Sequence, residues 1–313
     1  MEPSIDGLHH VTAIAADALA TTEFYRDTLG LRLVKQTVNH DEPETMHLYF
    51  GDADGTPGSP ITFFVWQDPS REGQFGAGQT KETLFSIGSQ SLDFWRQRLD
   101  DQGVQWRAEE RFGQSTLHFD DPDGIALGLV AVDGATEFGF EPWEASDVPV
   151  RHQLCGFFGV TLEVSDVEAT AKLLGETMGY ESTESDDHRR RLVASGERPA
   201  SVVDLLSSTR ARGEMGAGTV HHVAFRVPDT EALEMWRQRL IDAGLSPTEP
   251  IDRHYFTSIY TRKSQGILFE FATCGPGFER DEEASSLGEK LVLPPQLEAR
   301  RDELEALLPD ISR

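Results

Sequence analysis

The chain has 313 residues, 38% of them hydrophobic, and its 54 acidic side chains outnumber 28 basic ones to give a formal net charge of −26. A negative field of this size repels nucleic acid and anionic membranes, so we expect neither as a partner. No apolar run approaches the ~20 residues of a membrane span, and the N-terminal residues do not resemble a signal peptide. These features predict a cytoplasmic protein.

The acidic residues are scattered along the chain instead of forming a tail, and only five lysines are present. This composition is typical of halophilic proteins, whose acidic surfaces stay hydrated while concentrated salt screens their self-repulsion. Two cysteines without CxxC spacing are too few for a disulfide framework. The composition therefore indicates a salt-rich solvent and says nothing about catalysis, which must be inferred from the motifs.

Four units with the order strand, helix and two or three further strands follow one another. In the first unit we expect a strand at 9–16, a helix at 21–31 ending near Gly30, and strands at 32–38, 46–51 and 60–66. In the second we expect a strand at 84–87, a helix through 95–99, and strands at 115–119 and 124–130. In the third we expect a strand at 159–165, a helix at 167–179, and strands at 190–195 and 201–206. In the fourth we expect a strand at 223–227, a helix through 236–240, and strands at 257–261 and 266–272.

The repeat is clearest in the helices of the second and fourth units, where W-R-Q-R-L occurs at 95–99 and again at 236–240. Each copy is followed within a few residues by a glycine that can end the helix. The sequence therefore predicts an α+β fold of four tandem βαβββ modules.

The module boundaries divide the chain into two halves. Residues 1–135 would hold modules 1 and 2, and residues 151–276 would hold modules 3 and 4. A stretch with proline and glycine at 136–150 is the predicted linker. Residues 277–313 would form an acidic connector and a C-terminal helix at 296–308, with Leu297, Leu304, Leu307 and Leu308 on its apolar face.

Two strands begin with adjacent histidines, in L-H-H-V-T at 8–12 and V-H-H-V-A-F at 220–225. Because strand side chains alternate between faces, His10 and His222 lie opposite the apolar set of their strands. Glu270 lies between two phenylalanines in the last predicted strand, where an unpaired buried charge would cost several kcal/mol. The repeat has Gly128 at the matching place, so the fold itself does not require this carboxylate.

Two histidines and one carboxylate form a facial triad that suits non-haem Fe(II), with Mn(II) as the other candidate. Ligands of one metal must lie within a few ångströms of each other, so we expect module 1 to pair with module 4 around the metal. Modules 2 and 3 should then pair together. Module 3 has Gly159 in place of the histidine, and we expect its Asp204 to be structural.

The tandem modules resemble the vicinal oxygen chelate superfamily of glyoxalases, bleomycin resistance proteins and extradiol dioxygenases. Both His-His motifs, H-L-Y-F-G-D at 47–52, G-T-P-G at 55–58, R-F-G-Q at 111–114, the span 253–260, F-E-F-A-T at 269–273 and 286–295 are similar to its hydroquinone ring-cleaving branch. The resemblance implies two glyoxalase-like domains and the ligands His10, His222 and Glu270. It also implies roles in proton transfer and oxygen-anion stabilisation for His9, Thr12, His221, Arg253 and Tyr260.

The leading hypothesis is an Fe(II)-dependent, extradiol-type dioxygenase that opens a substituted hydroquinone with O2. A catechol extradiol dioxygenase is the nearest alternative, because the triad does not distinguish the two diols. A glyoxalase-like metal-dependent lyase or isomerase would need a fourth ligand, and the strand at 59–67 offers no carboxylate. A metal-free binding module would not need Glu270. Whether the chain forms a homo-oligomer is left open, as is the role of His254, while His47 is expected to be structural.

Overall fold

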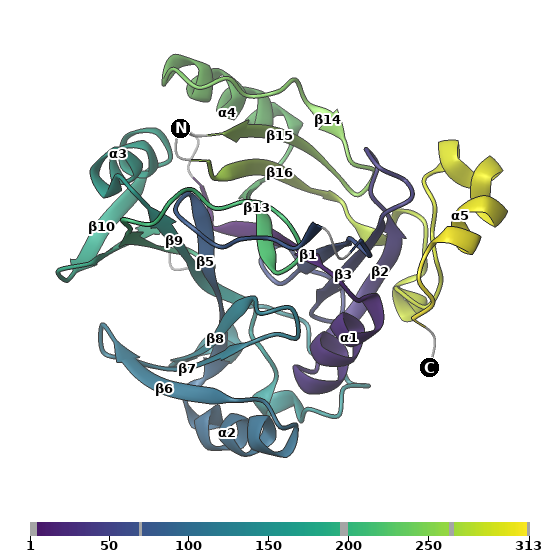
Figure 1. Cartoon of the computed structure of the whole chain (residues 1–313), viewed down its shortest axis with the longest axis horizontal. Helices are drawn as coiled ribbons and strands as arrows, with labels where there is room; N and C mark the ends of the chain where they lie inside the picture. The colour runs from purple at the N-terminus through teal and green to yellow at the C-terminus, as the bar shows by residue number, and fades with distance from the viewer. Residues whose placement is uncertain (1–4, 69–70, 195–199, 263–265, 312–313) are drawn as a thin grey trace.

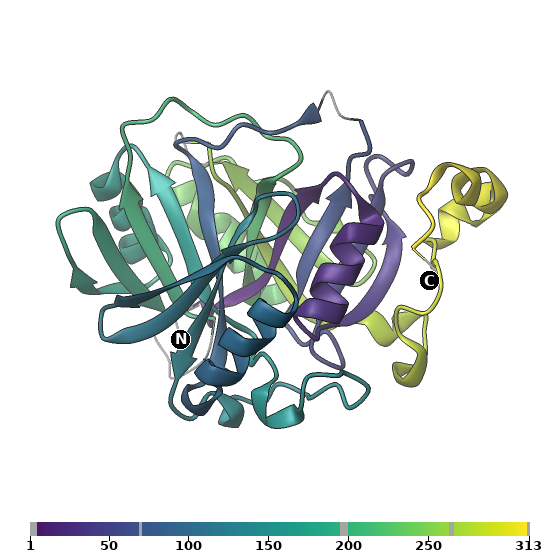
Figure 2. The ribbon, with the colours of Figure 1, turned by 60° about the horizontal axis from the view of Figure 1, so that its bottom comes forward.

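The computed structural model describes residues 5–68, 71–194, 200–262 and 266–311, and it contains two curled eight-stranded sheets with few helices (Figure 1). This α+β architecture confirms the predicted fold of four βαβββ modules. The two sheets lie side by side, and helices cover their outer faces (Figures 1 and 2).

Each module contributes four strands and a helix. Module 1 contains β1 (Leu8–Ala15), α1 (Ala18–Thr22), β2 (Arg32–Val38), β3 (Met46–Gly51) and β4 (Ile61–Val65). Module 2 contains β5 (Gln79–Gly88), α2 (Leu92–Asp101), β6 (Trp106–Arg111), β7 (Gln114–Asp120) and β8 (Ala126–Val132). Module 3 contains β9 (Phe157–Val164), α3 (Val167–Lys172), β10 (Tyr180–Ser185), β11 (Arg189–Ala194) and β12 (Val202–Ser207). Module 4 contains β13 (Thr219–Val227), α4 (Thr230–Asp242), β14 (Ile251–Asp252), β15 (Phe256–Arg262) and β16 (Leu268–Pro276).

The first sheet joins module 1 to module 4 in the order β14-β15-β16-β13-β1-β4-β3-β2. The antiparallel pair β1 and β13 forms its centre, with Thr12 opposite His222 and His10 opposite Ala224. On the other side of β13, Ala224 is opposite Glu270 of β16. The predicted pairing of modules 1 and 4 is confirmed, and it brings together residues more than two hundred positions apart.

The second sheet joins modules 2 and 3 in the order β10-β11-β12-β9-β5-β8-β7-β6, also as predicted. The antiparallel pair β5 and β9 takes the central place that β1 and β13 take in the first sheet. Each sheet therefore has one module from either side of the segment predicted as a linker.

The repeated W-R-Q-R-L motif anchors α2 and α4 to the sheets. Trp95 and Trp236 are completely buried, and the Trp236 ring stacks on Phe271 of β16 at 5.5 Å between ring centres. The flanking arginines and glutamine lie outside the core, where charged and amide groups stay hydrated. The motif is thus one apolar anchor on an otherwise polar helix.

The helices of modules 1 and 3 differ from the prediction. After α1 the chain continues as a π-helical turn, Glu23–Thr28, and after α3 it continues as another, Leu173–Thr177. The helices predicted at 21–31 and 167–179 are present and end near the expected glycines. Each is an α-helix only in its first part and a π-helical turn in its second. The π turn admits one extra residue per turn, which no periodicity of 3.6 can reveal.

The C-terminal segment packs against the outer edge of the first sheet, beside β2 (Figure 1). The predicted helix at 296–308 is in fact a 3-10 stretch, Pro295–Arg300, followed by the short α5, Arg301–Leu307. Leu297 and Leu308 pack against the cluster that contains the buried Leu304, so three of the four leucines share one apolar cluster. Leu304 is fully buried, whereas Leu307 is 53% exposed, so the expectation for Leu307 was wrong.

Short 3-10 turns connect several of these elements. They are Ser89–Ser91, Ala135–Glu137, Val150–His152, Phe278–Arg280 and Ala284–Ser286. In the described part of the chain, no helix has the length and apolar character needed to cross a membrane.

Candidate metal centre

A cavity of about 220 Å³ opens on the first sheet. Strands of modules 1 and 4 and two loops line it. From module 1 come His10 and Thr12 of β1, His47 and Tyr49 of β3, Phe64 and Trp66 at the end of β4, and residues 39–42 of the loop between β2 and β3. From module 4 come His221 and His222 of β13, Arg253 of the loop between β14 and β15, Phe256 and Tyr260 of β15, and Glu270 of β16. Seven of the eight predicted site residues line it. His9 lies behind His10.

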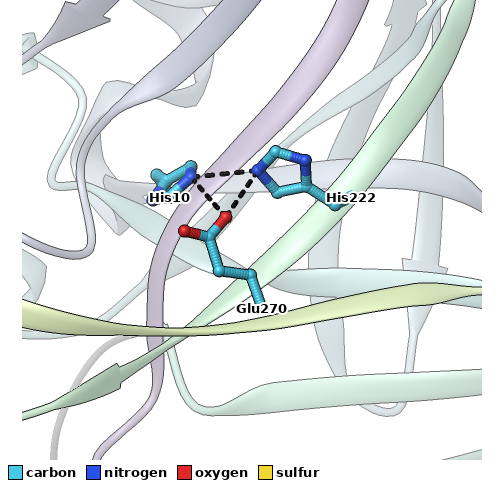
Figure 3. A group of neighbouring side chains, drawn as sticks. All are labelled: His10, His222 and Glu270. Atoms are coloured by element: carbon cyan, nitrogen blue, oxygen red, sulfur yellow. Dashed lines mark hydrogen bonds and ion pairs between the residues drawn. The ribbon is translucent and has the colours of Figure 1, made fainter. Parts of the chain in front are cut away.

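Three side chains converge at the floor of this cavity (Figure 3). His10 Nε2 lies 3.1 Å from His222 Nε2 and 3.2 Å from Glu270 Oε2, and His222 Nε2 lies 2.7 Å from the same oxygen. All three residues are buried. Among the described residues they are the one group of three with donor atoms close enough to share a metal ion.

The orientation of His10 is fixed by the histidine before it. His9 Nε2 lies 3.1 Å from the carbonyl oxygen of Thr273, so it donates its proton there. Burial, followed by the charge of His10, lowers the pKa of His9 to about 3, which keeps this ring neutral. His9 Nδ1 must then accept a hydrogen bond from His10 Nδ1, 2.9 Å away. A neutral His10 therefore presents an unprotonated Nε2 to the centre.

His222 has the same relation to His221. Their Nδ1 atoms lie 2.8 Å apart, so one of the two imidazoles donates to the other. Burial is the main cause that lowers the pKa of both His221, to about 3, and His222. Each expected ligand histidine is thus held through Nδ1 by its neighbour, and its Nε2 faces the carboxylate.

Glu270 has no exposed surface, and its two oxygens have different surroundings. Oε1 accepts hydrogen bonds from Ser258 and from Tyr260, the latter at 2.9 Å. Oε2 faces the two imidazoles but receives no hydrogen bond from the described residues. Burial would raise the pKa of Glu270, but positive charge at His10 and His222 would hold it well below its usual range. With both imidazoles neutral, a cation bound between the three residues would supply that charge. A buried anionic oxygen without a donor, beside two nitrogen lone pairs, fits a bound cation.

Tyr260 and Arg253 extend this arrangement toward the mouth of the cavity. Arg253 Nε donates to the Tyr260 hydroxyl at 3.0 Å, and that hydroxyl donates to Glu270. Burial, together with the charge of Glu270, raises the pKa of Tyr260 well above its usual value, so the hydroxyl keeps its proton. The guanidinium thus lies two hydrogen bonds away from the carboxylate.

Thr12 takes part in a second chain of polar groups. Its hydroxyl lies 2.8 Å from the Thr62 hydroxyl, which lies 2.9 Å from His47 Nε2. Thr62 occupies in module 1 the register position that Glu270 occupies in module 4. Burial lowers the pKa of His47 well below its usual value. Sequence reasoning missed Thr62 and treated His47 as structural only, although both alternate onto the cavity face of their strands.

The described residues of the second sheet form no such centre. Glu82 and Gly159 occupy the positions of the two ligand histidines, and Asp204 occupies that of Glu270. At Gly159 a Cβ would lie 2.1 Å from the carbonyl oxygen of Val202, so no side chain fits there. Asp204 is paired with Arg191 through two hydrogen bonds of 2.8 and 2.9 Å. This pairing agrees with a structural role for Asp204.

The remaining histidines were not assigned. His40 lies on the loop that lines the cavity, His118 binds Glu82 of the second sheet, and His254 is 2.9 Å from Asp281. His152 stacks on Phe94, and His188 lies in the turn before β11. Of these, only His40 lies at the cavity.

Residues 7–129 and 146–271 match the model of the Glyoxalase/Bleomycin resistance protein/Dioxygenase superfamily. The chain is 41% identical over 304 residues to MhqO of Bacillus subtilis (strain 168), provisionally named a ring-cleaving dioxygenase, with 97% of this chain and 96% of MhqO covered. It is 33% identical over 309 residues to the chlorohydroquinone/hydroquinone 1,2-dioxygenase of Sphingobium indicum, covering 96% of this chain and 95% of that protein.

Solved structures agree with the fold. A crystal structure of a provisionally named dioxygenase from Bacillus subtilis subsp. subtilis str. 168 superposes with a TM-score of 0.93 at 40% identity, covering 99% of this chain and 98% of that one. Glyoxalase I from Zea mays superposes with a TM-score of 0.63 at 14% identity, covering 86% and 92%. At that identity the likeness concerns the fold alone.

Proposed function

The chain belongs to the Glyoxalase/Bleomycin resistance protein/Dioxygenase superfamily, and we propose that it is a metal-dependent ring-cleaving dioxygenase that opens a substituted hydroquinone with O2. The observation that carries this proposal is the convergence of His10 Nε2, His222 Nε2 and Glu270 Oε2 at the floor of one cavity. Relatives named for ring cleavage, one of them for hydroquinone, supply the reaction class.

His10, His222 and Glu270 would hold the metal, for which we propose Fe(II), with Mn(II) as the alternative. Two nitrogens and one carboxylate oxygen on one side leave the other side of an ion open, as non-haem iron oxygenases require. When bound, such a metal supplies the Lewis acidity and the redox chemistry that a diol and O2 need. The side chains around the metal would bind the substrate oxygen and transfer protons.

Arg253 and Tyr260 would bind the oxygen anion of the substrate. The guanidinium is a permanent cation with fixed donors. The Tyr260 hydroxyl keeps its proton because of its raised pKa and donates it to Glu270, so it would bind the substrate oxygen by turning that proton away from the carboxylate. Arg253 is 17% exposed and Tyr260 lines the cavity, so both donors work in an environment that largely excludes water. Electrostatic stabilisation of this kind is strongest where water is excluded.

Proton transfer is assigned to His221 and to Thr12. His221 lines the cavity, so its ring lies where it could exchange a proton with a bound hydroxyl. Burial lowers its pKa to about 3, so the ring is a weak base until substrate or metal changes its surroundings. Thr12 can pass a proton toward Thr62 and His47 along hydrogen bonds of 2.8 and 2.9 Å. His9, which lies behind His10, would orient that ligand instead of touching the substrate.

A glyoxalase-like reaction finds less support. Its family pattern uses a carboxylate from each of two modules, and β4 places Thr62 at the register position of the second one. Cleavage of a catechol is chemically close, and the cavity volume of about 220 Å³ accommodates either diol. The substrate must therefore be decided by assay.

The test is O2 uptake by protein that has been loaded anaerobically with Fe(II) and given methylhydroquinone or catechol. We expect uptake with the hydroquinone that disappears in Glu270→Ala. Asp204→Asn, which changes the matching carboxylate of the second sheet, is the control and should retain uptake in the folded fraction. Uptake with catechol only would keep the site and change the substrate, and no uptake despite one bound Fe(II) per chain would refute the dioxygenase.

A further inference from the structure

The mouth of the cavity is formed by a loop that no catalytic proposal has used. Residues 39–42, between β2 and β3, line the cavity opposite Arg253. Asp41 Oδ2 lies 3.0 Å from Arg253 Nη1. The Asp41 side chain is 70% exposed and Arg253 only 17%, so the pair lies at the boundary between solvent and the cavity.

Arg253 is the one lysine or arginine among the described residues that line the cavity. Its Nε edge faces inward to Tyr260, and its Nη1 edge faces outward to Asp41. An anionic group that binds at the Nη1 edge must therefore compete with Asp41, whereas an oxygen bound from inside the cavity can use the remaining donors of the guanidinium.

The other ionisable groups at the mouth do not offset this competition. Glu42 lines the cavity and adds a second negative charge beside Asp41. His40 is neutral at pH 7, because burial and the nearby Arg253 lower its pKa to about 4. A negatively charged molecule thus meets two carboxylates and a guanidinium that is already paired.

We propose that Asp41 sets the charge selectivity of the cavity: by occupying Arg253 it lets the site accept uncharged aromatic diols and reject diols with a ring carboxylate. The proposal rests on the proposed function for the identity of the substrate class, but the charge arrangement itself does not depend on turnover. Like-charge repulsion at a rim is a common means of rejecting wrong partners.

Two ligands that share the diol and differ in one charged substituent test this proposal: hydroquinone and gentisate, which is hydroquinone with one ring carboxylate. We would measure the Kd of both for the metal-free protein by calorimetry, in the wild type, Asp41→Asn and Glu44→Gln. Glu44 is the matched control, because it loses the same charge from the same loop but pairs with Arg300 and does not line the cavity.

We expect Asp41→Asn to lower the Kd of gentisate about tenfold relative to the Kd of hydroquinone. Glu44→Gln should leave the ratio of these two Kd values unchanged. Molar KCl should shrink the difference, since it screens exposed charges. The same shift should occur in the ratio of kcat/KM for the two diols when the protein is loaded with Fe(II). An unchanged ratio in Asp41→Asn, or equal weakening of both ligands, would overturn the proposal and leave Asp41 as a support for Arg253.

The two failures can be told apart. If no diol is turned over but the ratio of binding constants still shifts in Asp41→Asn, the proposed function fails and the charge selectivity stands. If diols are turned over and the ratio does not shift, the selectivity fails and the function stands.

Discussion

The orientation of His10, which we propose as a metal ligand, is fixed by the residue next to it. The Thr273 carbonyl accepts from His9, His9 accepts from His10, and a neutral His10 therefore has no proton on its Nε2 atom. Such outer groups fix the tautomer and ring angle of a ligand and raise its basicity. The His-His motif therefore supplies one ligand and one support from two adjacent residues.

We expect His9→Ala to weaken metal binding by about 10- to 100-fold, because His10 would lose the partner that fixes its tautomer. The measurement is a titration of the metal-free protein with Fe(II) or Mn(II). His152→Ala, which removes a half-buried histidine far from the cavity, is the control and should bind the metal as the wild type does. Equal affinities in His9→Ala and the wild type would contradict the supporting role.

The sequence predicted the three converging residues from three features: the repeated His-His motifs, the alternation of side chains along each strand, and a carboxylate, Glu270, between two phenylalanines. It could not predict Thr62, His47 or Ser258, since a strand threonine, histidine or serine is ordinary and its partners lie on other strands. Asp41 is a loop residue that meets Arg253 across 212 positions of sequence. Periodicity carries no information about where a loop folds.

At the scale of elements, the βαβββ module builds two different polar centres, one in each sheet. The first sheet gathers uncharged imidazoles and one carboxylate around a cavity, whereas the second gathers Glu82, Arg111 and His118 into a closed ion-pair cluster. Glu82 is only 5% exposed and accepts hydrogen bonds from both partners. This cluster forms the polar core of its sheet, where the first sheet has its candidate metal centre.

Glu82→Gln should destabilise the protein at pH 7 by about 3 kcal/mol, because it removes the buried carboxylate of the pair with Arg111 and leaves that guanidinium only the more exposed Glu109. Burial opposes ionisation of Glu82, but hydrogen bonds from His118 and Arg111 and their charges lower its pKa to about 2, below the ordinary 4.5. The unfolded chain therefore binds more protons between these values, and the stability from Glu82, present above pH 4.5, is lost as the pH falls toward 2.

Urea unfolding of the wild type and Glu82→Gln at pH 7, pH 5 and the lowest pH at which both still fold would test this. The gap in unfolding free energy should be constant above pH 4.5 and narrow below it. A gap that stays constant into the acid range would show that the ionisation of Glu82 is not linked to folding.

The helix of module 4 offers a test of local stabilisation. Asp229 is the N-cap of α4, and its carboxylate accepts a hydrogen bond from the Ala232 amide at 2.9 Å. Asp229→Ala should lower the unfolding free energy by about 1 kcal/mol, and Asp229→Ser should recover most of it. Asp242→Ala, at the other end of the helix, is the matched control for loss of an acid. An equal loss in both alanine variants would contradict the capping role.

The order of strands and helices was predictable because the apolar patterns of the four modules resemble each other. The π turns after α1 and α3 were not, since a local change in helical hydrogen bonding leaves no mark on composition. The prediction of one C-terminal α-helix was wrong for a similar reason. Pro294 and Pro295 begin a 3-10 stretch instead of an α-helix.

The whole molecule carries a charge of −26, which opposes folding through self-repulsion at low salt. We expect KCl to raise the Tm, by about 5 °C or more between low and molar concentration, as the Debye length falls from roughly 30 to 3 Å. The measurement is thermal unfolding across a KCl series, with sucrose at matched osmolality as the control for a general solute effect. A Tm that is independent of KCl would contradict adaptation of this surface to salt.

One measurement tests the central claim, that the cavity of the first sheet opens a hydroquinone ring with both atoms of O2. Fe(II)-loaded protein would be given methylhydroquinone under heavy-isotope oxygen gas, and the product examined by mass spectrometry. We predict a ring-opened carboxylated product that gains both labelled atoms and is absent with Glu270→Ala. A quinone without label, formed by simple oxidation, or a labelled product that persists in the Glu270→Ala variant, would contradict the account.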